Sequence, residues 1–256
     1  PQIIDCDSPE EIAAIEIDDP EIRSTEIDKS LINMASISLN PDIVSIEKFK
    51  QVMIEVLDRD QGYAFSYQES QGFLPLRESI ALYLKTNGVN TSADTVQIMS
   101  GAQPGIDIGA RALLDYGDCV FTEAPTYPGA IAAFRSRGAK IIDIPLDEQG
   151  MDIDLLEEKL RCFRPKLVYL MPNIQNPTGI SYSLERRNRL MGLARYYNFF
   201  ILEDDYISEL SYVNEALAPL KAIDRDDRVI YLKSFSKIFM PGLRLAFLTM
   251  PKQLAP

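Results

Sequence analysis

The sequence has 256 residues, of which 46% are hydrophobic and 25% are charged, which is ordinary for a soluble globular protein and allows one large domain with a full core. Its formal net charge of −12, together with the lack of a clustered Lys/Arg face, argues against direct nucleic-acid binding by this segment. The sequence contains no histidine, which excludes Ser–His and Cys–His nucleophile pairs and histidine metal sites and leaves acid–base chemistry to Lys, Tyr, Asp and Glu.

Residues 1–30 are acidic and lack a sustained hydrophobic period, which predicts a linker or an N-terminal arm. The first residues do not resemble a signal peptide, and no apolar run in the sequence approaches the length of a membrane span. The cysteines, Cys6, Cys119 and Cys162, are scattered and lack metal spacing, so we expect a reducing cytoplasm. The chain has no initiator methionine and ends just after an apolar segment, so we read it as a piece of a longer protein.

Apolar residues at helical spacing predict helices over 43–57 and 74–84, separated by a glycine-bounded aromatic loop at 62–72. From Thr95 onward, β-type runs alternate with helical patterns, for which Asp154, in a capping-box spacing, and Ser183 are candidate N-terminal caps. This alternation predicts an α/β fold with a mostly parallel, seven-stranded sheet that helices cover on both faces. The predicted strands are 96–99, 119–122, 140–144, 167–170, 199–202, 229–232 and 245–249, and the helices between them are 106–114, 129–136, 153–160 and 184–197.

Residues that directly follow the strands are the first candidates for a ligand site, because ligands of open α/β sheets bind at the carboxyl ends of the strands. The small residues of 100–105, which include Ala102 and Gln103, open a helix and either present N–H groups to a phosphate or form a plain strand–helix turn. Tyr127, which lies between two prolines, is either a rigid stacking face for an aromatic ring or a buried core tyrosine.

The next two strand ends carry an amide and a cluster of acids. Asn176, held extended before a proline, offers its amide to a ligand oxygen or belongs to an ordinary turn. The three acids at 203–205 follow an apolar run and are costly to bury unless a positive group meets them. A protonated ring nitrogen held by Asp204, with the Tyr206 hydroxyl close by, would meet that need, and we expect Asp205 to lie at the solvated surface.

The last strand delivers Ser234, Ser236 and Lys237 into a turn, and Arg244 follows seven residues after the lysine. A lysine that acts as an amine nucleophile needs a carbonyl to attack, while hydroxyls and a guanidinium suit a phosphate. Taken alone, the motif would be better explained as a surface lysine in a serine-rich turn. Together with the other strand ends, the motif indicates a lysine that forms a Schiff base with pyridoxal 5′-phosphate.

These stretches, from Tyr67 to Arg244, resemble the fold-type I pyridoxal-phosphate aminotransferases of class I/II. The resemblance rests on Asn176-Pro-Thr-Gly179, Glu203-Asp-Asp-Tyr206, Ser234-Phe-Ser-Lys237 and Gly242-Leu-Arg244. It covers about residues 31–256 and implies that they form the large cofactor-binding domain. It also implies that the small C-terminal domain, where the family binds the substrate carboxylate with an arginine, is missing from this chain.

The resemblance implies a role for each of these residues. Lys237 would form the Schiff base, Asp204 would pair with the pyridine nitrogen, and Tyr206 would hold the phenolic oxygen together with Asn176. Tyr127 would stack on the ring. The phosphate would be bound by Ala102, Gln103, Ser234, Ser236 and Arg244, and Tyr67 would reach the phosphate of a dimer partner.

Two groups within the family look similar to this sequence: the 2-aminoadipate/aromatic aminotransferases and the MocR regulators, in which an aminotransferase-like domain follows a GntR-type winged helix. The run at 204–212 looks more MocR-like, and residues 1–30 resemble the linker of those regulators. The resemblance therefore implies a homodimer that either transfers amino groups between an amino acid and a 2-oxo acid or senses an amine effector as part of a transcription regulator. A different reaction on the same scaffold, such as β-elimination or decarboxylation, is a third option.

Overall fold

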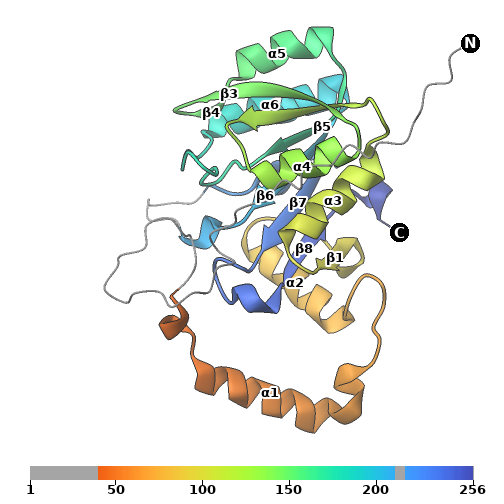
Figure 1. Ribbon diagram of the computed structural model, residues 1–256, viewed down its shortest axis with the longest axis vertical. Coiled ribbons are helices and arrows are strands. Elements are labelled where there is room, and N and C mark those ends of the chain that lie inside the picture. The colour runs from red at the N-terminus through yellow and green to blue at the C-terminus, as the bar shows by residue number, and fades with distance from the viewer. Residues whose placement is uncertain (1–39, 211–216, 256) are drawn as a thin grey trace, which may run out of the picture. The chain divides into compact units, whose positions relative to one another are not determined.

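The computed structural model describes residues 40–210 and 217–255, and within them eight strands form one sheet in the order β1-β8-β7-β6-β5-β2-β3-β4 (Figure 1). β8 is antiparallel to both of its neighbours and β4 is antiparallel to β3, whereas the other pairs are parallel. All seven predicted strands are present, so the mostly parallel α/β sheet is confirmed. The strands are β1 (Val96–Met99), β2 (Cys119–Ala124), β3 (Lys140–Asp147), β4 (Gly150–Met151), β5 (Pro165–Leu170), β6 (Phe200–Asp205), β7 (Val229–Ser234) and β8 (Ala246–Thr249).

The helices agree with the predicted periodicity except at some of their starts. Ser183 caps its helix as expected, since its side chain accepts from the backbone N–H of Arg186. Asp154 does not cap; instead the Asp152 carboxylate accepts from the N–H groups of Asp154 and Leu155, both at 3.0 Å. The helices are α1 (Ile46–Asp60), α2 (Leu74–Thr86), α3 (Ala102–Leu113), α4 (Pro128–Ser136), α5 (Ile153–Cys162), α6 (Leu184–Tyr197) and α7 (Leu220–Ile223), and α7 was not predicted.

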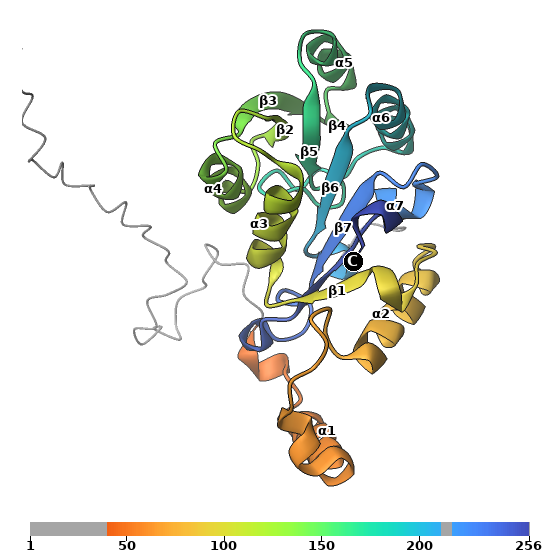
Figure 2. The ribbon, with the colours of Figure 1, turned by 90° about the vertical axis from the view of Figure 1, so that its right-hand side faces the viewer.

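Helices cover both faces of the sheet, with α3 and α4 on one side and α2, α5, α6 and α7 on the other (Figure 2). Strand alternation decides the side: on β7, Leu232 packs in the cluster of α3 and α4, while the preceding Tyr231 packs in the cluster of α2. The strands β2, β3, β5, β6 and β7 are parallel, so their carboxyl ends lie at the same edge of the sheet. In the described part of the chain, no helix has the length and apolar character needed to span a membrane.

The β7–β8 connection leaves the sheet and returns to the neighbouring strand. Ser234 at the end of β7 lies opposite Ala246 at the start of β8. The N–H of Phe235 donates to the carbonyl of Leu245 at 3.1 Å, which closes the base of the connection. The intervening residues 236–244 therefore form an excursion with both ends fixed in the sheet, and this excursion carries Lys237 and Arg244.

Residues 1–30, where the sequence predicts a linker or arm, lie outside the described residues. α1 matches the predicted helix in type, but it buries none of its residues. Its exposed side chains include Val52, Met53 and Ile54, all at least 47% accessible. α1 therefore contributes no residue to the buried core described above.

Candidate functional site

Asp204 is the buried acid at the centre of the strand ends. It is 4% exposed, and its Oδ2 accepts from the Tyr169 hydroxyl of β5 at 2.7 Å. Its Oδ1 is buried and finds no hydrogen-bond partner among the described residues. Burial, with a smaller contribution from the neighbouring Asp205, raises the pKa of Asp204 to about 6, against the bond from Tyr169. A buried carboxylate with one unsatisfied oxygen suits a cationic N–H group.

Asp205 is not at the surface as the sequence suggested; it is 1% exposed. Its Oδ1 lies 3.0 Å from the Lys233 Nζ, and its Oδ2 accepts from Tyr231 at 2.7 Å. Burial alone would raise the pKa of Asp205, but Lys233 and these hydrogen bonds hold it below its ordinary value. The positive group that meets Asp205 is thus a lysine of the same chain, which the β6–β7 register places opposite it.

The third acid, Glu203, is also buried, at 0% exposure. Its two oxygens accept from the backbone N–H groups of Leu220 and Lys221, at 2.7 and 2.9 Å, at the start of α7. Burial raises its pKa to about 7, and the two backbone bonds oppose that rise. Glu203 therefore holds the start of α7, and its side chain does not reach toward the same partners as Asp204.

Arg244 lies against the start of α3, the region predicted to seat a phosphate. Gly101, with φ of 102°, precedes α3, and a Cβ atom there would collide with the Arg244 guanidinium. The first turn of α3 includes Ala102 and Gln103, and its free N–H groups and helix dipole favour an anion. Ser234 ends β7 and Ser236 begins the excursion that carries Arg244, and the Ser236 N–H donates to the Ser234 Oγ at 3.2 Å. The structure thus brings a guanidinium and a helix N-terminus together.

Tyr127 lies beside the same helix start. A Cβ atom on Gly129 would come within 2.5 Å of the Tyr127 ring and would also meet the Gln103 Oε1. The Gln103 side chain donates to the Gly129 carbonyl at 2.9 Å, while its Oε1 is buried without a partner in the described residues. Tyr127 is half-buried and packs on the cluster of α3 and α4, so both readings of this residue, core tyrosine and ring face, agree with its position.

Asn176 and Tyr206 are half-buried at the ends of β5 and β6. Burial raises the pKa of the Tyr206 phenol, and the charges of Asp204 and Asp205 add to the rise. The backbone around Asn176 is held by the side chain of Gln175, a residue that the sequence analysis did not single out.

The two lysines at the end of β7 differ in their surroundings. Lys233 is 0% exposed and, besides Asp205, it pairs with Glu209 at 2.5 Å. Lys237 is half-buried in the turn that follows β7. An amine that must meet a ligand carbonyl has to be reachable from the site, so of these two Lys237 is the candidate nucleophile.

Tyr67 does not join these residues within one chain. It is fully exposed on the aromatic loop. The loop itself is fixed: the buried Arg77 donates to the Gly72 carbonyl at 3.0 Å and to the Gln71 Oε1 at 2.8 Å, and it pairs with Glu69. The structure therefore presents the Tyr67 ring to the outside on a braced loop.

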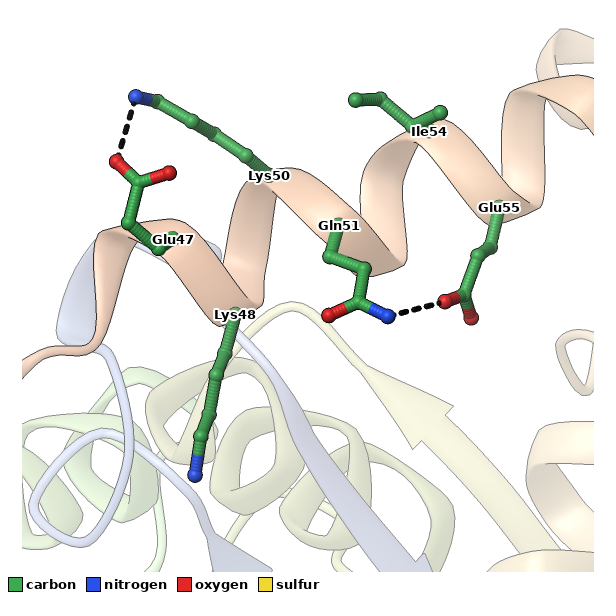
Figure 3. A pocket seen from close by; sticks show the side chains of 6 residues that line it. All are labelled: Glu47, Lys48, Lys50, Gln51, Ile54 and Glu55. Atoms are coloured by element: carbon green, nitrogen blue, oxygen red, sulfur yellow. Dashed lines mark hydrogen bonds and ion pairs between the residues drawn. The ribbon is translucent and has the colours of Figure 1, made fainter.

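A hollow of about 480 Å³ lies along α1, away from the strand ends (Figure 3). Four of its five polar side chains pair with one another, Lys50 with Glu47 at 2.9 Å and Gln51 with Glu55 at 2.8 Å. None of the predicted site residues lines it. The lining residues are Glu47, Lys48, Lys50, Gln51, Ile54 and Glu55.

The described residues contain no group of three or more acidic or cysteine side chains arranged to hold a metal ion.

Comparison with known proteins gives matches that cover most of the chain. The family model described as aminotransferase class I and II matches residues 36–255. Aromatic-amino-acid aminotransferase 1 of Thermococcus litoralis is 38% identical over 81% of this chain and 51% of its own length. The HTH-type transcriptional regulator YdfD of Bacillus subtilis is 33% identical over 91% of this chain and 48% of its own length. The chain spans about half the length of these curated relatives.

Among solved structures, the kynurenine aminotransferase of Pyrococcus horikoshii, crystallised in complex with PMP, superposes with a TM-score of 0.82. It is 37% identical, and the match covers 86% of this chain and 56% of that one. The fold described above is therefore shared with the matching part of this structure.

Proposed function

Since the chain belongs to the class I and II aminotransferase family, we propose that it binds pyridoxal 5′-phosphate and, within the whole protein, transfers amino groups between an amino acid and a 2-oxo acid. The observation that carries the proposal is the buried Oδ1 of Asp204, which has no hydrogen-bond partner in the part of the chain that the structure describes. A protonated pyridine nitrogen is the kind of group that this oxygen lacks, and it would keep the carboxylate ionised despite its burial.

The other residues of the site fit the remaining parts of the cofactor. Arg244, with the first turn of α3 at Ala102 and Gln103, suits the phosphate, and Ser234 and Ser236 add hydroxyl and backbone donors. Tyr127 offers a ring face beside α3. Asn176 and Tyr206 offer donors at neighbouring strand ends for the phenolic oxygen. These are the roles that the resemblance implies.

When bound, pyridoxal phosphate supplies an electron sink that stabilises negative charge at the substrate's α carbon. The chain's own contribution is orientation and proton handling. Asp204 holds the proton on the ring nitrogen by accepting it in a hydrogen bond. The Lys237 Nζ would hold the cofactor and, as a free amine, would carry the proton that leaves the α carbon.

We further propose a homodimer in which Tyr67 reaches the phosphate of the partner subunit. The support is that the Tyr67 ring is fully exposed while the loop beneath it is braced by the buried Arg77. α1 adds an unburied apolar surface through Val52, Met53 and Ile54, which a second copy would cover. Amino acids and 2-oxo acids are the proposed small-molecule partners, in the cytoplasm.

A second candidate function is that of an amine-sensing domain in a MocR-type transcription regulator. The similarity to the regulator YdfD, over 91% of this chain, favours it. A sensor needs the same lysine and the same cofactor contacts as an enzyme, so these residues serve both functions. The net charge of −12 argues that DNA contact, in that case, is made by another part of the protein.

An absorbance titration of the full-length protein with pyridoxal phosphate, followed by amino donors, tests both candidates. A visible band that bleaches with an amino acid and returns with a 2-oxo acid would establish the aminotransferase. A band that shifts with amines without completing a half-reaction would favour the sensor. If the protein gives no band, or if Lys237→Ala leaves the band unchanged, the proposal is wrong.

A further inference from the structure

Gln175, which directly precedes Asn176, lies between two loops of the candidate site and is 1% exposed. We infer that it is a positioning residue that holds the loop of Asn176 and the loop of Tyr127 in one fixed arrangement around the bound cofactor. The inference rests on the proposed function. Gln175 lies outside the motifs described above, and it is not one of the residues proposed to contact the cofactor.

The amide nitrogen of Gln175 reaches the loop that follows β2. Its Nε2 donates to the Pro125 carbonyl at 2.8 Å and to the Glu123 Oε2 at 3.1 Å. An amide nitrogen has two hydrogens, so both donors are used, one on Glu123 near the end of β2 and one on Pro125 in the loop that follows it. Tyr127 stands two residues after Pro125, so the position of its ring depends on where this loop is held.

The amide oxygen of Gln175 holds its own loop. Its Oε1 accepts from the backbone N–H of Thr178 at 3.0 Å and from the Thr178 hydroxyl at 2.6 Å. The Gln175 backbone adds bonds from the Gly179 N–H at 2.6 Å and to the Ile180 carbonyl at 2.8 Å. Asn176 lies between Gln175 and Thr178, so the chain is fixed on both sides of the proposed ligand amide.

Glu123, the acceptor for Gln175 on β2, is itself held in place by buried hydrogen bonds. It is 1% exposed, and its Oε1 accepts from the Tyr182 hydroxyl at 2.6 Å and from the Met171 N–H at 3.2 Å. The carboxylate therefore cannot turn away from Gln175 without leaving two buried donors unsatisfied. Every polar position of the Gln175 amide is occupied, and a change at this one side chain must move both loops.

The direct test is Gln175→Glu in the full-length protein. The variant has nearly the same shape and keeps the acceptor for Thr178, but it replaces the donor with an oxygen that faces Glu123 and Pro125. We expect about tenfold weaker binding of pyridoxal phosphate, the equivalent of one lost hydrogen bond, and a changed visible circular dichroism band of the bound cofactor. Gln149→Glu, at an exposed glutamine of the same domain, is the matched control and should behave as wild type.

A swap provides the rescue. In the double variant Glu123→Gln, Gln175→Glu, the new amide at 123 can donate to the new carboxylate at 175 and still accept from Tyr182 and Met171. We expect it to recover the part of the lost affinity that depends on the contact between positions 123 and 175, and to move the visible band back toward that of the wild type, while the contact with the Pro125 carbonyl stays lost. If Gln175→Glu does not fold, Gln175→Met removes the donor without adding charge and carries the same expectation for binding and spectrum.

A Gln175→Glu protein with wild-type affinity and an unchanged visible band would overturn the inference. So would a variant that only unfolds more easily without cofactor, because that result assigns Gln175 a purely structural role. A wild-type protein without any visible band would overturn the proposed function and this inference with it.

Discussion

Asp204→Asn should remove a pH-dependent destabilisation from the cofactor-free protein. In the folded state the pKa of Asp204 is raised to about 6, whereas an unfolded aspartate titrates near its ordinary value of 3.8. Between these two values the folded state binds more protons than the unfolded state, so stability falls as the pH rises through this window and stays reduced above it. A difference of about two pKa units corresponds to roughly 3 kcal/mol at neutral pH.

Asparagine has the same shape and still accepts from the Tyr169 hydroxyl, but it carries no charge to bury. The variant also leaves an unsatisfied amide, which lowers its unfolding free energy by roughly 1–3 kcal/mol at every pH. The informative quantity is therefore how the difference in unfolding free energy between variant and wild type changes with pH. From about pH 4.5 to about pH 7.5, the unfolding free energy of the variant relative to wild type should rise by about 2 kcal/mol.

Urea denaturation of the cofactor-free full-length proteins at several pH values provides the measurement. Glu123 and Glu203 titrate in both proteins, so their effects largely cancel in the comparison. Asp58→Asn removes the same formal charge from the exposed side of α1 and controls for net charge. Parallel pH profiles for wild type and Asp204→Asn would refute the reasoning, because they would mean that the Asp204 carboxylate is not held in a desolvated site.

Three further experiments, one chemical labelling and two substitutions, test other parts of the site. Borohydride reduction of the protein loaded with pyridoxal phosphate should label Lys237 and leave the buried Lys233 unlabelled, as peptide mass spectrometry can determine; a label on Lys233 would contradict the assignment. Gly101→Ala should weaken cofactor binding about tenfold, since its Cβ would displace the Arg244 guanidinium and strain a backbone at φ of 102°, and unchanged affinity in a titration would argue against a phosphate seat there. Tyr182→Phe should lower the unfolding free energy by about 1–3 kcal/mol in urea, because it removes the buried donor to Glu123, and a neutral effect would mean that this bond is not needed.

The sheet, and the placement of most candidate residues near strand ends, could be predicted because their signals are local. Each predicted strand is a mostly apolar run, and most candidate residues lie at its end or shortly after it, whereas Tyr67 lies before α2 and Arg244 just before β8. The parts that were missed depend on pairing between distant residues. Asp205 was placed in solvent because its partner, Lys233, meets it only through the β6–β7 register. A lysine inside an otherwise apolar β-run was the available signal.

Short elements were missed for a different reason. β4 has two residues and α7 has four, so neither is long enough to show a period. α3 begins at Ala102 and not at 106, because its first turn is built of small residues that carry no apolar pattern. Gln175 could not be singled out at all, since its role lies in contacts with Glu123 of β2 and Pro125 of the loop that follows, both distant in sequence.

The excursion between β7 and β8 begins and ends at residues that pair within the sheet. Since Ser234 and Ala246 lie opposite each other in the β7–β8 register, the number of residues in the excursion can change without shifting either strand. A one-residue insertion near Pro241 would lengthen the span between the Lys237 amine and the Arg244 guanidinium and leave the rest of the fold in place. The length of this connection therefore sets the distance between the lysine and the arginine independently of the sheet, so the same scaffold can accommodate a ligand of different length.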